Sequence, residues 1–232
     1  MLSKLSIKAI YFISIVVFAI GLLGTSEWIK YNETKRVELL ESQFNKYSSQ
    51  AYISVKNALT SELERLNSLA AVFKISDSVS QRDFERFAKV LLANDTEVQA
   101  LEWIELIPKN QRLLFESEMS SLLGIENFKI QAKQKGKLVN SNSVQDYYAV
   151  VKYVYPYQNN VKAIGLDAYS QESTKHAMYI ADITQSPITT PPLQLIQKTS
   201  GDYSFIIYQP IYDKADKLQG YVALLLNMKH FV

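Results

Sequence analysis

The sequence predicts an α+β fold, in which an N-terminal transmembrane helix and a long stalk helix precede a domain of mixed or antiparallel strands with short flanking helices. Three observations predict it. Residues 9–26 carry no charge, no glycine or proline occurs between Gly24 and Pro108, and the rest of the chain alternates apolar runs with turn residues. Because glycine and proline punctuate loops, their absence over so long a stretch is typical of helix.

The first element is a membrane-spanning segment. Lys4 and Lys8 precede Ala9–Ser26, about 18 uncharged residues, which is close to the ~20 that a spanning helix needs. The two lysines before the segment and a glutamate after it predict a cytoplasmic N-terminus, with the chain from Trp28 onward outside. A cleaved signal peptide is the alternative, because residues 24–26 are small, although the apolar stretch exceeds a typical signal core.

A long helix is predicted next, over residues 27–73. Its apolar positions recur at three- and four-residue steps, as on one face of a helix, and include Leu40, Leu66 and Phe73. About 47 residues at ~1.5 Å each would span roughly 70 Å, which is more than the width of a small domain. We therefore expect a stalk that continues along the side of a domain. Two helices with a break near Ser48–Ser49 are the alternative.

The elements after the stalk follow from capping residues and periodicity. Ser80 and Asp83 resemble a capping box and predict a short helix, a second helix should end at Gly124, and a third should cover residues 172–184. Strands are predicted, in sequence order, over 98–108, 128–133, 147–157, 163–167, 193–197, 203–212 and 218–228. The last of these runs is too continuously apolar to be an edge strand.

Composition excludes several classes of function. The chain has no cysteine, which excludes disulfides, thiolate catalysis and cysteine-based zinc sites. Its two histidines, His176 and His230, lie far apart in sequence, so we expect no transition-metal site and no cofactor. The P-loop, dinucleotide, nucleophile-elbow and HExxH motifs are absent. A net charge of +2 gives no basic field, so we expect no nucleic-acid partner.

One carboxylate stands out. Asp167 ends the apolar run Ala163–Leu166, just before a polar helix. An unpaired charge at such a place costs several kcal/mol, so something must donate to it. A catalytic role is disfavoured because no second carboxylate lies within a defined reach. Capping of the following helix is one interpretation, although Ser170 or Ser173 is closer to the helix start. Binding of a ligand N–H is the other.

The chain also carries, in order, "FERFAKVLL", "VQALEWIELIPKNQRLLFE", "YYAVVKYVYPYQNNVKAIGLDAYSQESTKHAMYIADITQSPITTPP", "YQPIYDK" and "LQGYVALLLN". In their order and spacing these segments resemble the CHASE domain, the extracytoplasmic sensory module of histidine kinases, nucleotide cyclases and diguanylate cyclases. The resemblance covers roughly Leu66–Val232. It departs after Asp167, where the family often has arginine and proline and this chain has Ser173, Thr174 and Lys175, which puts an anionic ligand contact from that helix in doubt.

The resemblance implies a long helix packed on two stacked PAS-like subdomains, with the ligand in the membrane-distal one. It divides the chain into an anchor (1–26), a stalk or dimerisation helix (27–73), a ligand-binding part (74–186), and the remaining strands with the start of an exit helix (187–232). In the plant cytokinin receptors an aspartate accepts hydrogen bonds from the ligand ring, and by resemblance this aspartate is Asp167.

The resemblance also implies further ligand-binding residues. A backbone contact falls on Ile188, and a hydroxyl falls on Thr199 or Ser200. Trp103 and Tyr148 are candidate aromatic wall residues because of their strand positions.

The function that follows is ligand sensing by a receptor input module. We expect it to lie outside a bacterial inner (cell) membrane, to form a homodimer, and to bind a small molecule that is adenine-like, a peptide or an amino acid. The chain itself would not be an enzyme; a kinase or cyclase output domain is missing from it. The alternative is a membrane-anchored dimerisation or protein-binding module without a small-molecule pocket.

Overall fold

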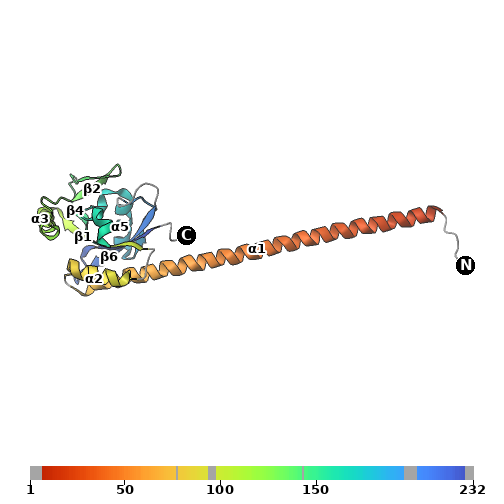
Figure 1. Cartoon of the computed structure of the whole chain (residues 1–232), viewed down its shortest axis with the longest axis horizontal. Helices are drawn as coiled ribbons and strands as arrows, with labels where there is room; N and C mark the ends of the chain where they lie inside the picture. Colours follow the sequence, from red (N-terminus) through yellow and green to blue (C-terminus); the bar gives the residue numbers. More distant parts are fainter. Residues whose placement is uncertain (1–6, 77, 94–97, 143, 196–202, 228–232) are drawn as a thin grey trace. The chain divides into compact units, whose positions relative to one another are not determined.

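The computed structural model of the chain describes residues 7–76, 78–93, 98–142, 144–195 and 203–227. The chain divides into two compact units, Met1–Lys56 and Asn57–Val232. Helix α1 (Ile7–Ile75) runs from the first unit into the second without interruption (Figure 1). The single long helix is therefore confirmed, and a break near Ser48–Ser49 is not observed.

In the first unit the apolar side chains of α1 face outward on all sides. Between Ile10 and Leu23 the large apolar side chains are 39% to 69% exposed. Hydroxyl groups in this stretch donate to backbone carbonyls of the same helix, as Thr25 does to Gly21 at 2.8 Å. By length and composition α1 is a candidate membrane span. A helix that is apolar all around and has its backbone groups satisfied internally suits a hydrocarbon surrounding.

The second unit is built on one antiparallel sheet of five strands in the order β4-β1-β7-β6-β5. The strands are β1 (Val98–Pro108), β4 (Tyr147–Tyr155), β5 (Ile188–Thr189), β6 (Ser204–Tyr212) and β7 (Leu218–Asn227). A separate hairpin consists of β2 (Gln131–Gln134) and β3 (Lys137–Asn140). The central positions of β1 and β7 agree with their nearly continuous apolar sequences, since both faces of a central strand are covered.

Helices cover both faces of this sheet (Figure 1). The C-terminal part of α1 and helix α2 (Gln81–Leu91) lie on one face, where Leu66, Leu69 and Phe84 are fully buried. Helices α3 (Arg112–Leu123) and α5 (Glu172–Thr184) lie on the other, with α4 (Tyr157–Asn160) and the short 3-10 helices η1 (Lys109–Gln111), η2 (Val161–Ala163) and η3 (Ala168–Ser170). Burial of one large apolar side chain stabilises the fold by about 1.5–3 kcal/mol, so both layers contribute.

Local sequence signals fix several element ends. The Ser80 hydroxyl caps α2 by accepting from the backbone N–H of Asp83 at 3.2 Å, as the capping box predicts. Gly124 ends α3 in the left-handed conformation, with φ of 65°, which glycine adopts without strain. The predicted helix 172–184 and the strand 98–108 have the predicted bounds.

Two predicted strands are wrong. Residues 163–167 are not a strand: Gly165 has φ of 84°, outside the extended region, and Leu166 and Asp167 form only isolated bridges, to Gln131 and Val150. Of residues 193–197, only Leu193 forms a bridge, to Ser204, and residues 196 and 197 lie outside the described part. The strand that pairs with this part of β6 is β5, which lies between Pro187 and Pro191.

The α+β class and the PAS-like antiparallel sheet are confirmed, and the described strands form one five-stranded sheet and the separate β2–β3 hairpin. The division of the chain at residue 187 stays a prediction. Strands β6 and β7, placed by the sequence in a separate part, hydrogen-bond along their length to each other, and β7 pairs with β1. Residues on either side of position 187 therefore share one sheet.

Candidate functional site

Asp167 is fully buried, and its carboxylate accepts hydrogen bonds from its own chain. Oδ1 accepts from the backbone N–H groups of Ala149 and Tyr169, both at 3.1 Å. Oδ2 accepts from the side-chain amide of Gln145 at 2.6 Å. The bond to Tyr169 caps η3. Asp167 thus ties β4, the segment before it and η3 together.

This geometry decides between the capping residues that the sequence suggests. Asp167 caps the short helix η3, and Gln171 rather than Ser170 or Ser173 is the N-cap residue of α5. Burial raises the pKa of Asp167 to about 6, while the three hydrogen bonds and the charge of Arg112 act in the opposite direction. The carboxylate is therefore mainly ionised at neutral pH and is held by donors inside the domain.

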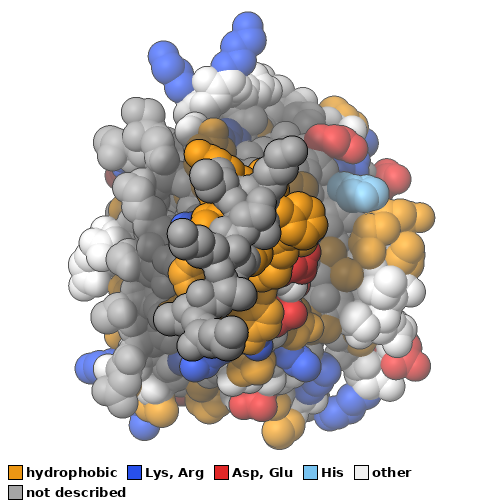
Figure 2. All heavy atoms as spheres, turned by 90° about the vertical axis from the view of Figure 1, so that its right-hand side faces the viewer, with side chains coloured by type: hydrophobic (Ala, Val, Ile, Leu, Met, Phe, Trp, Pro, Cys, Tyr) orange, Lys and Arg blue, Asp and Glu red, His pale blue; other side chains and the backbone are white. Residues whose placement is uncertain are grey.

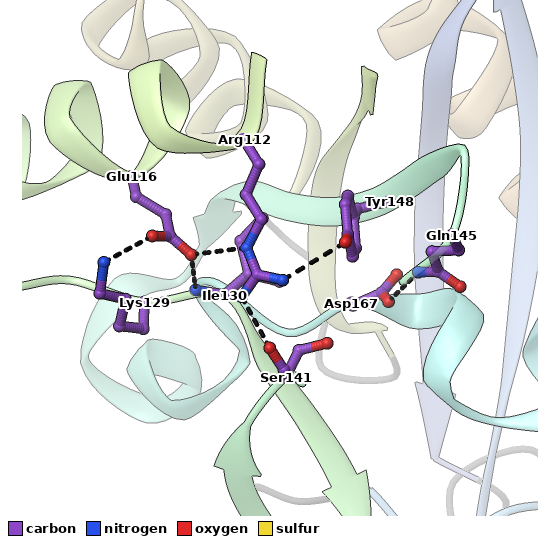
Figure 3. Close-up of polar contacts among 8 residues, drawn as sticks. All are labelled: Arg112, Glu116, Lys129, Ile130, Ser141, Gln145, Tyr148 and Asp167. Carbon is purple, nitrogen blue, oxygen red and sulfur yellow. Dashed lines mark hydrogen bonds and ion pairs between the residues drawn. The ribbon is translucent and has the colours of Figure 1, made fainter. Parts of the chain in front are cut away.

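Figure 3 shows an ion cluster beside Asp167. The Arg112 guanidinium donates to Glu116 at 2.9 Å, to the Tyr148 hydroxyl at 3.3 Å and to the Ser141 carbonyl at 2.7 Å. Glu116 is buried and also pairs with Lys129 at 2.8 Å. Burial acts to raise the pKa of Glu116, but its bonds to Lys129, Arg112 and a backbone N–H hold it below its usual value. Each charged group of the cluster therefore has a partner of opposite charge.

Of the six sequence-predicted binding residues, the four that the structure describes do not meet at one place. Tyr148 lies in the cluster next to Asp167 and is 2% exposed. Trp103 lies in the apolar layer between the sheet and α1, and its ring stacks on Phe73 with centroids 4.1 Å apart. Ile188 is half-buried in edge strand β5, opposite Tyr208. The other two, Thr199 and Ser200, lie outside the described residues.

A narrow cavity of about 30 Å³ lies on the α5 face of the sheet. Its apolar lining includes Leu166 and Ala168, the two neighbours of Asp167. Its polar lining includes Glu102 and Tyr208 from the sheet. The cavity is therefore adjacent to the acid that the sequence singles out, but a different acid lines it.

Glu102 is the most unusual charged residue of the domain. It lies in the middle of β1, is 4% exposed, and makes no hydrogen bond or ion pair with the residues that the structure describes. Burial raises the pKa of its carboxyl to about 8. An isolated ionised carboxylate in such a place costs several kcal/mol, so the acid holds its proton at neutral pH instead.

The groups around Glu102 leave it without a partner. Burial raises the pKa of Tyr208 well above its usual value, and the charge of Glu102 adds to this. Lys133, which is half-buried, donates from its ammonium group to the Gln194 carbonyl at 2.5 Å. The Thr174 hydroxyl donates to the carbonyls of Ala168 and Gln171.

The sequence contains a signal for the burial of Glu102. The residue alternates with Ala100 and Ile104 along β1, and both of these are fully buried. A glutamate in phase with core positions of a central strand is expected to be buried.

A larger hollow of about 280 Å³ lies on the other face, near the end of α1 and Trp103. Its acidic groups already have partners: Glu105 pairs with Lys152 at 2.6 Å, and Asp213 accepts from two backbone N–H groups of its own turn. We therefore favour the smaller cavity, where a buried carboxyl lacks a partner, as the candidate site.

Two further observations limit the chemistry. No group of three or more metal-ligating side chains occurs within the described part of the chain. In the view of Figure 2, described basic and acidic side chains are interspersed around the periphery. Among the described side chains this face therefore shows no concentration of one sign of charge.

The chain is similar to several solved structures. An extracellular ligand binding receptor from Desulfohalobium retbaense DSM5692 has a TM-score of 0.45 at 12% identity, with 78% of this chain and 25% of that one covered. The ligand binding domain of the Pseudomonas aeruginosa PAO1 amino acid chemoreceptor PctC, solved with GABA, has a TM-score of 0.42 at 13% identity, with 81% and 62% covered.

The periplasmic sensory domain of the Campylobacter jejuni chemoreceptor Tlp1 has a TM-score of 0.45 at 10% identity, with 81% and 59% covered. The chain thus spans between a quarter and about three fifths of the lengths of these three structures. Among curated proteins, no sequence matches the chain.

The sheet, with helices on both faces, lies within the part of the chain that matches a family model. The chain belongs to the CHASE domain family, which it matches over residues 77–232. This match begins just after α1, so it includes every strand of the sheet and both acids discussed above.

Proposed function

We propose that this chain is the extracytoplasmic input module of a membrane-bound signalling receptor, and that it binds a small molecule in the cavity lined by Glu102. The observation that carries the proposal is a buried carboxyl without a partner, facing a cavity in a domain of the CHASE family. Native proteins rarely leave such a group unsatisfied, and a ligand donor would satisfy it.

The proposal includes a route by which binding would reach α1. Glu102 and Trp103 are neighbours on β1 with side chains on opposite faces of the sheet, because successive residues of a strand alternate. Trp103 stacks on Phe73 of α1 with an angle of 19° between the rings. A ligand that binds one arrangement of this strand more tightly than another would shift the packing of α1.

The proposal also includes an inner-membrane location, a single span and a homodimer. Because the chain has no cysteine, a single Ser117→Cys variant on the exposed face of α3 gives a unique label site. In intact cells, a maleimide that does not cross membranes is expected to label it. Labelling only after lysis would contradict the location, and crosslinking of the full chain in nanodiscs would test the dimer.

Calorimetry with the full chain in nanodiscs tests binding itself, against adenine derivatives, amino acids and short peptides. Leu193→Phe enlarges a half-buried wall residue of the cavity and is expected to weaken binding at least about tenfold. Leu113→Phe, the same change on the exposed side of α3, is the matched control. Equal binding by both variants would rule out this cavity.

A second candidate, a dimerisation or protein-binding module without a pocket, is favoured by the small volume of the cavity and by the complete satisfaction of Asp167. It predicts that no member of the panel binds while the full chain still forms dimers.

A further inference from the structure

We propose that the cavity binds the positively charged amino group of its ligand, and that Glu102 pairs with that group. This inference rests on the proposed function and adds the chemical class of the ligand to it.

The first argument is the lack of any internal partner for Glu102. The residue sits in the middle of the sheet, with Val154 of β4 and Ala223 of β7 as its cross-strand neighbours. Neither supplies a side-chain donor, and no described residue donates to the carboxyl. A protein that needed only to fill this position would be more stable with an apolar residue, because burial of a carboxyl costs free energy in either protonation state.

The second argument is the distribution of the nearby charges. The titratable groups that line the cavity with Glu102 are Lys133 on β2 and Tyr208 on β6. The ammonium group of Lys133 is already bonded to a backbone carbonyl, and Lys133 is more exposed than Glu102. Among the described residues Glu102 therefore has no cationic partner in the cavity, and a cationic ligand would supply one.

The third argument is size. A cavity needs about 10–15 Å³ to hold one water molecule, so about 30 Å³ accommodates a group the size of an ammonium ion. The apolar walls, formed by residues such as Ile104, Leu193 and Leu225, suit a short alkyl chain attached to it. A neutral end could hydrogen-bond to the protonated carboxyl, but only a cationic end would compensate the charge of the ionised carboxylate.

Pairing also predicts a proton change. Burial raises the pKa of Glu102 to about 8, so the free protein holds the proton at pH 7. A cation beside the carboxyl favours its ionised form. Binding of an alkylammonium ion at pH 7 should therefore release close to one proton from Glu102 to the buffer.

The test uses the full chain in nanodiscs and isobutylamine as the probe, with isobutanol and isobutyrate as neutral and anionic analogues of similar shape. Titration calorimetry in phosphate and in Tris at pH 7 gives the number of protons released, because the two buffers differ in ionisation enthalpy. We expect the amine to bind with release of about one proton, and the analogues to bind at least about tenfold more weakly.

Two variants complete the test. Glu102→Gln keeps the shape of the neutral acid and is expected to lose both amine binding and proton release. Glu105→Gln, on the same strand but paired with Lys152 and partly exposed, should retain both. Amine binding without proton release, or unchanged in Glu102→Gln, would overturn the inference.

The failure of this inference can be distinguished from failure of the proposed function. If the amine does not bind while a neutral or anionic compound of the wider panel does, and Leu193→Phe weakens that binding, the cavity is a ligand site but Glu102 is not a cation site. If no compound binds, both proposals are wrong.

Discussion

Glu102→Gln is expected to remove a strong pH dependence of stability. Burial raises the pKa of this carboxyl from its ordinary value of 4.5 to about 8. Between these values the unfolded chain has lost the proton and the folded chain keeps it. The free energy of unfolding therefore falls as pH rises, because the folded state binds more protons than the unfolded state. Below pH 4.5 both states are protonated, and the penalty is absent.

The magnitude follows from the shift. One pKa unit corresponds to about 1.4 kcal/mol, so the whole shift amounts to roughly 5 kcal/mol once the folded protein has ionised. Between pH 5 and pH 9 the wild type should lose about 4 kcal/mol relative to Glu102→Gln, with a slope near 1.4 kcal/mol per pH unit up to pH 8. The variant has a neutral amide of the same shape, so its stability should not follow this slope.

Urea unfolding of the full chain in nanodiscs, followed by the fluorescence of Trp103, measures this at each pH. The difference between wild type and variant cancels the titration of every other group that both contain. Glu105→Gln serves as the control for loss of one glutamate from the same strand. Wild-type and Glu102→Gln curves that stay parallel within about 0.5 kcal/mol would refute the reasoning.

Three further changes test the rest of the domain. Asp167→Ala leaves three donors without an acceptor and should lower the unfolding free energy by about 2–4 kcal/mol in urea, with a smaller loss for Asp167→Asn; equal losses would contradict the capping role. Arg112→Met leaves the buried Glu116 carboxylate undercompensated and should cost up to about 3–5 kcal/mol, partly restored by adding Glu116→Gln. Gly220→Ala would place a Cβ 2.1 Å from the Ile104 carbonyl oxygen and should lower the unfolding free energy by about 1–3 kcal/mol. An unchanged urea midpoint would contradict this steric clash.

Elements with a strong local signal could be predicted from the sequence. The strand 98–108, the helix 172–184 and the caps at Ser80 and Gly124 depend on periodicity and on single residues that act within a few positions. The strand predicted over 163–167 failed because one glycine in a left-handed conformation interrupts an otherwise apolar run. Nothing in the run Ala163–Leu166 reveals which backbone conformation the glycine will take.

The site was harder to predict because its contacts are long-range. The donors to Asp167 include Ala149 and Gln145, which are 18 and 22 positions earlier in the chain. Rules that consider only neighbouring residues assign the capping role to a nearby serine, because they do not include donors from a distant segment such as β4. Trp103 and Tyr148 lie on opposite faces of the sheet. Which face each side chain takes depends on the register between β1 and β4, and this register shifts at a bulge between Trp103 and Ile104.

Two of the buried acids of this domain, Asp167 and Glu102, show why burial alone does not identify a binding residue. Asp167 and Glu102 are both almost inaccessible, and burial raises the pKa of both. Asp167 receives three hydrogen bonds, which bring its pKa down to about 6 and keep it charged at neutral pH as part of the fold. Glu102 receives none from the described residues, and its pKa stays near 8.

The difference between these acids is the number of donors that the chain itself supplies. An acid whose donors are all internal has no free acceptor capacity, so a ligand would have to displace one of them at a cost of about 1–3 kcal/mol. An acid with no internal donor gains the whole of that interaction from a ligand. Because Glu102 also shares β1 with Trp103, its ionisation by a bound cation would change the strand that packs against α1 through Phe73. Glu102, which has no donor among the described residues, is therefore the acid that our proposal places between ligand binding and the helix.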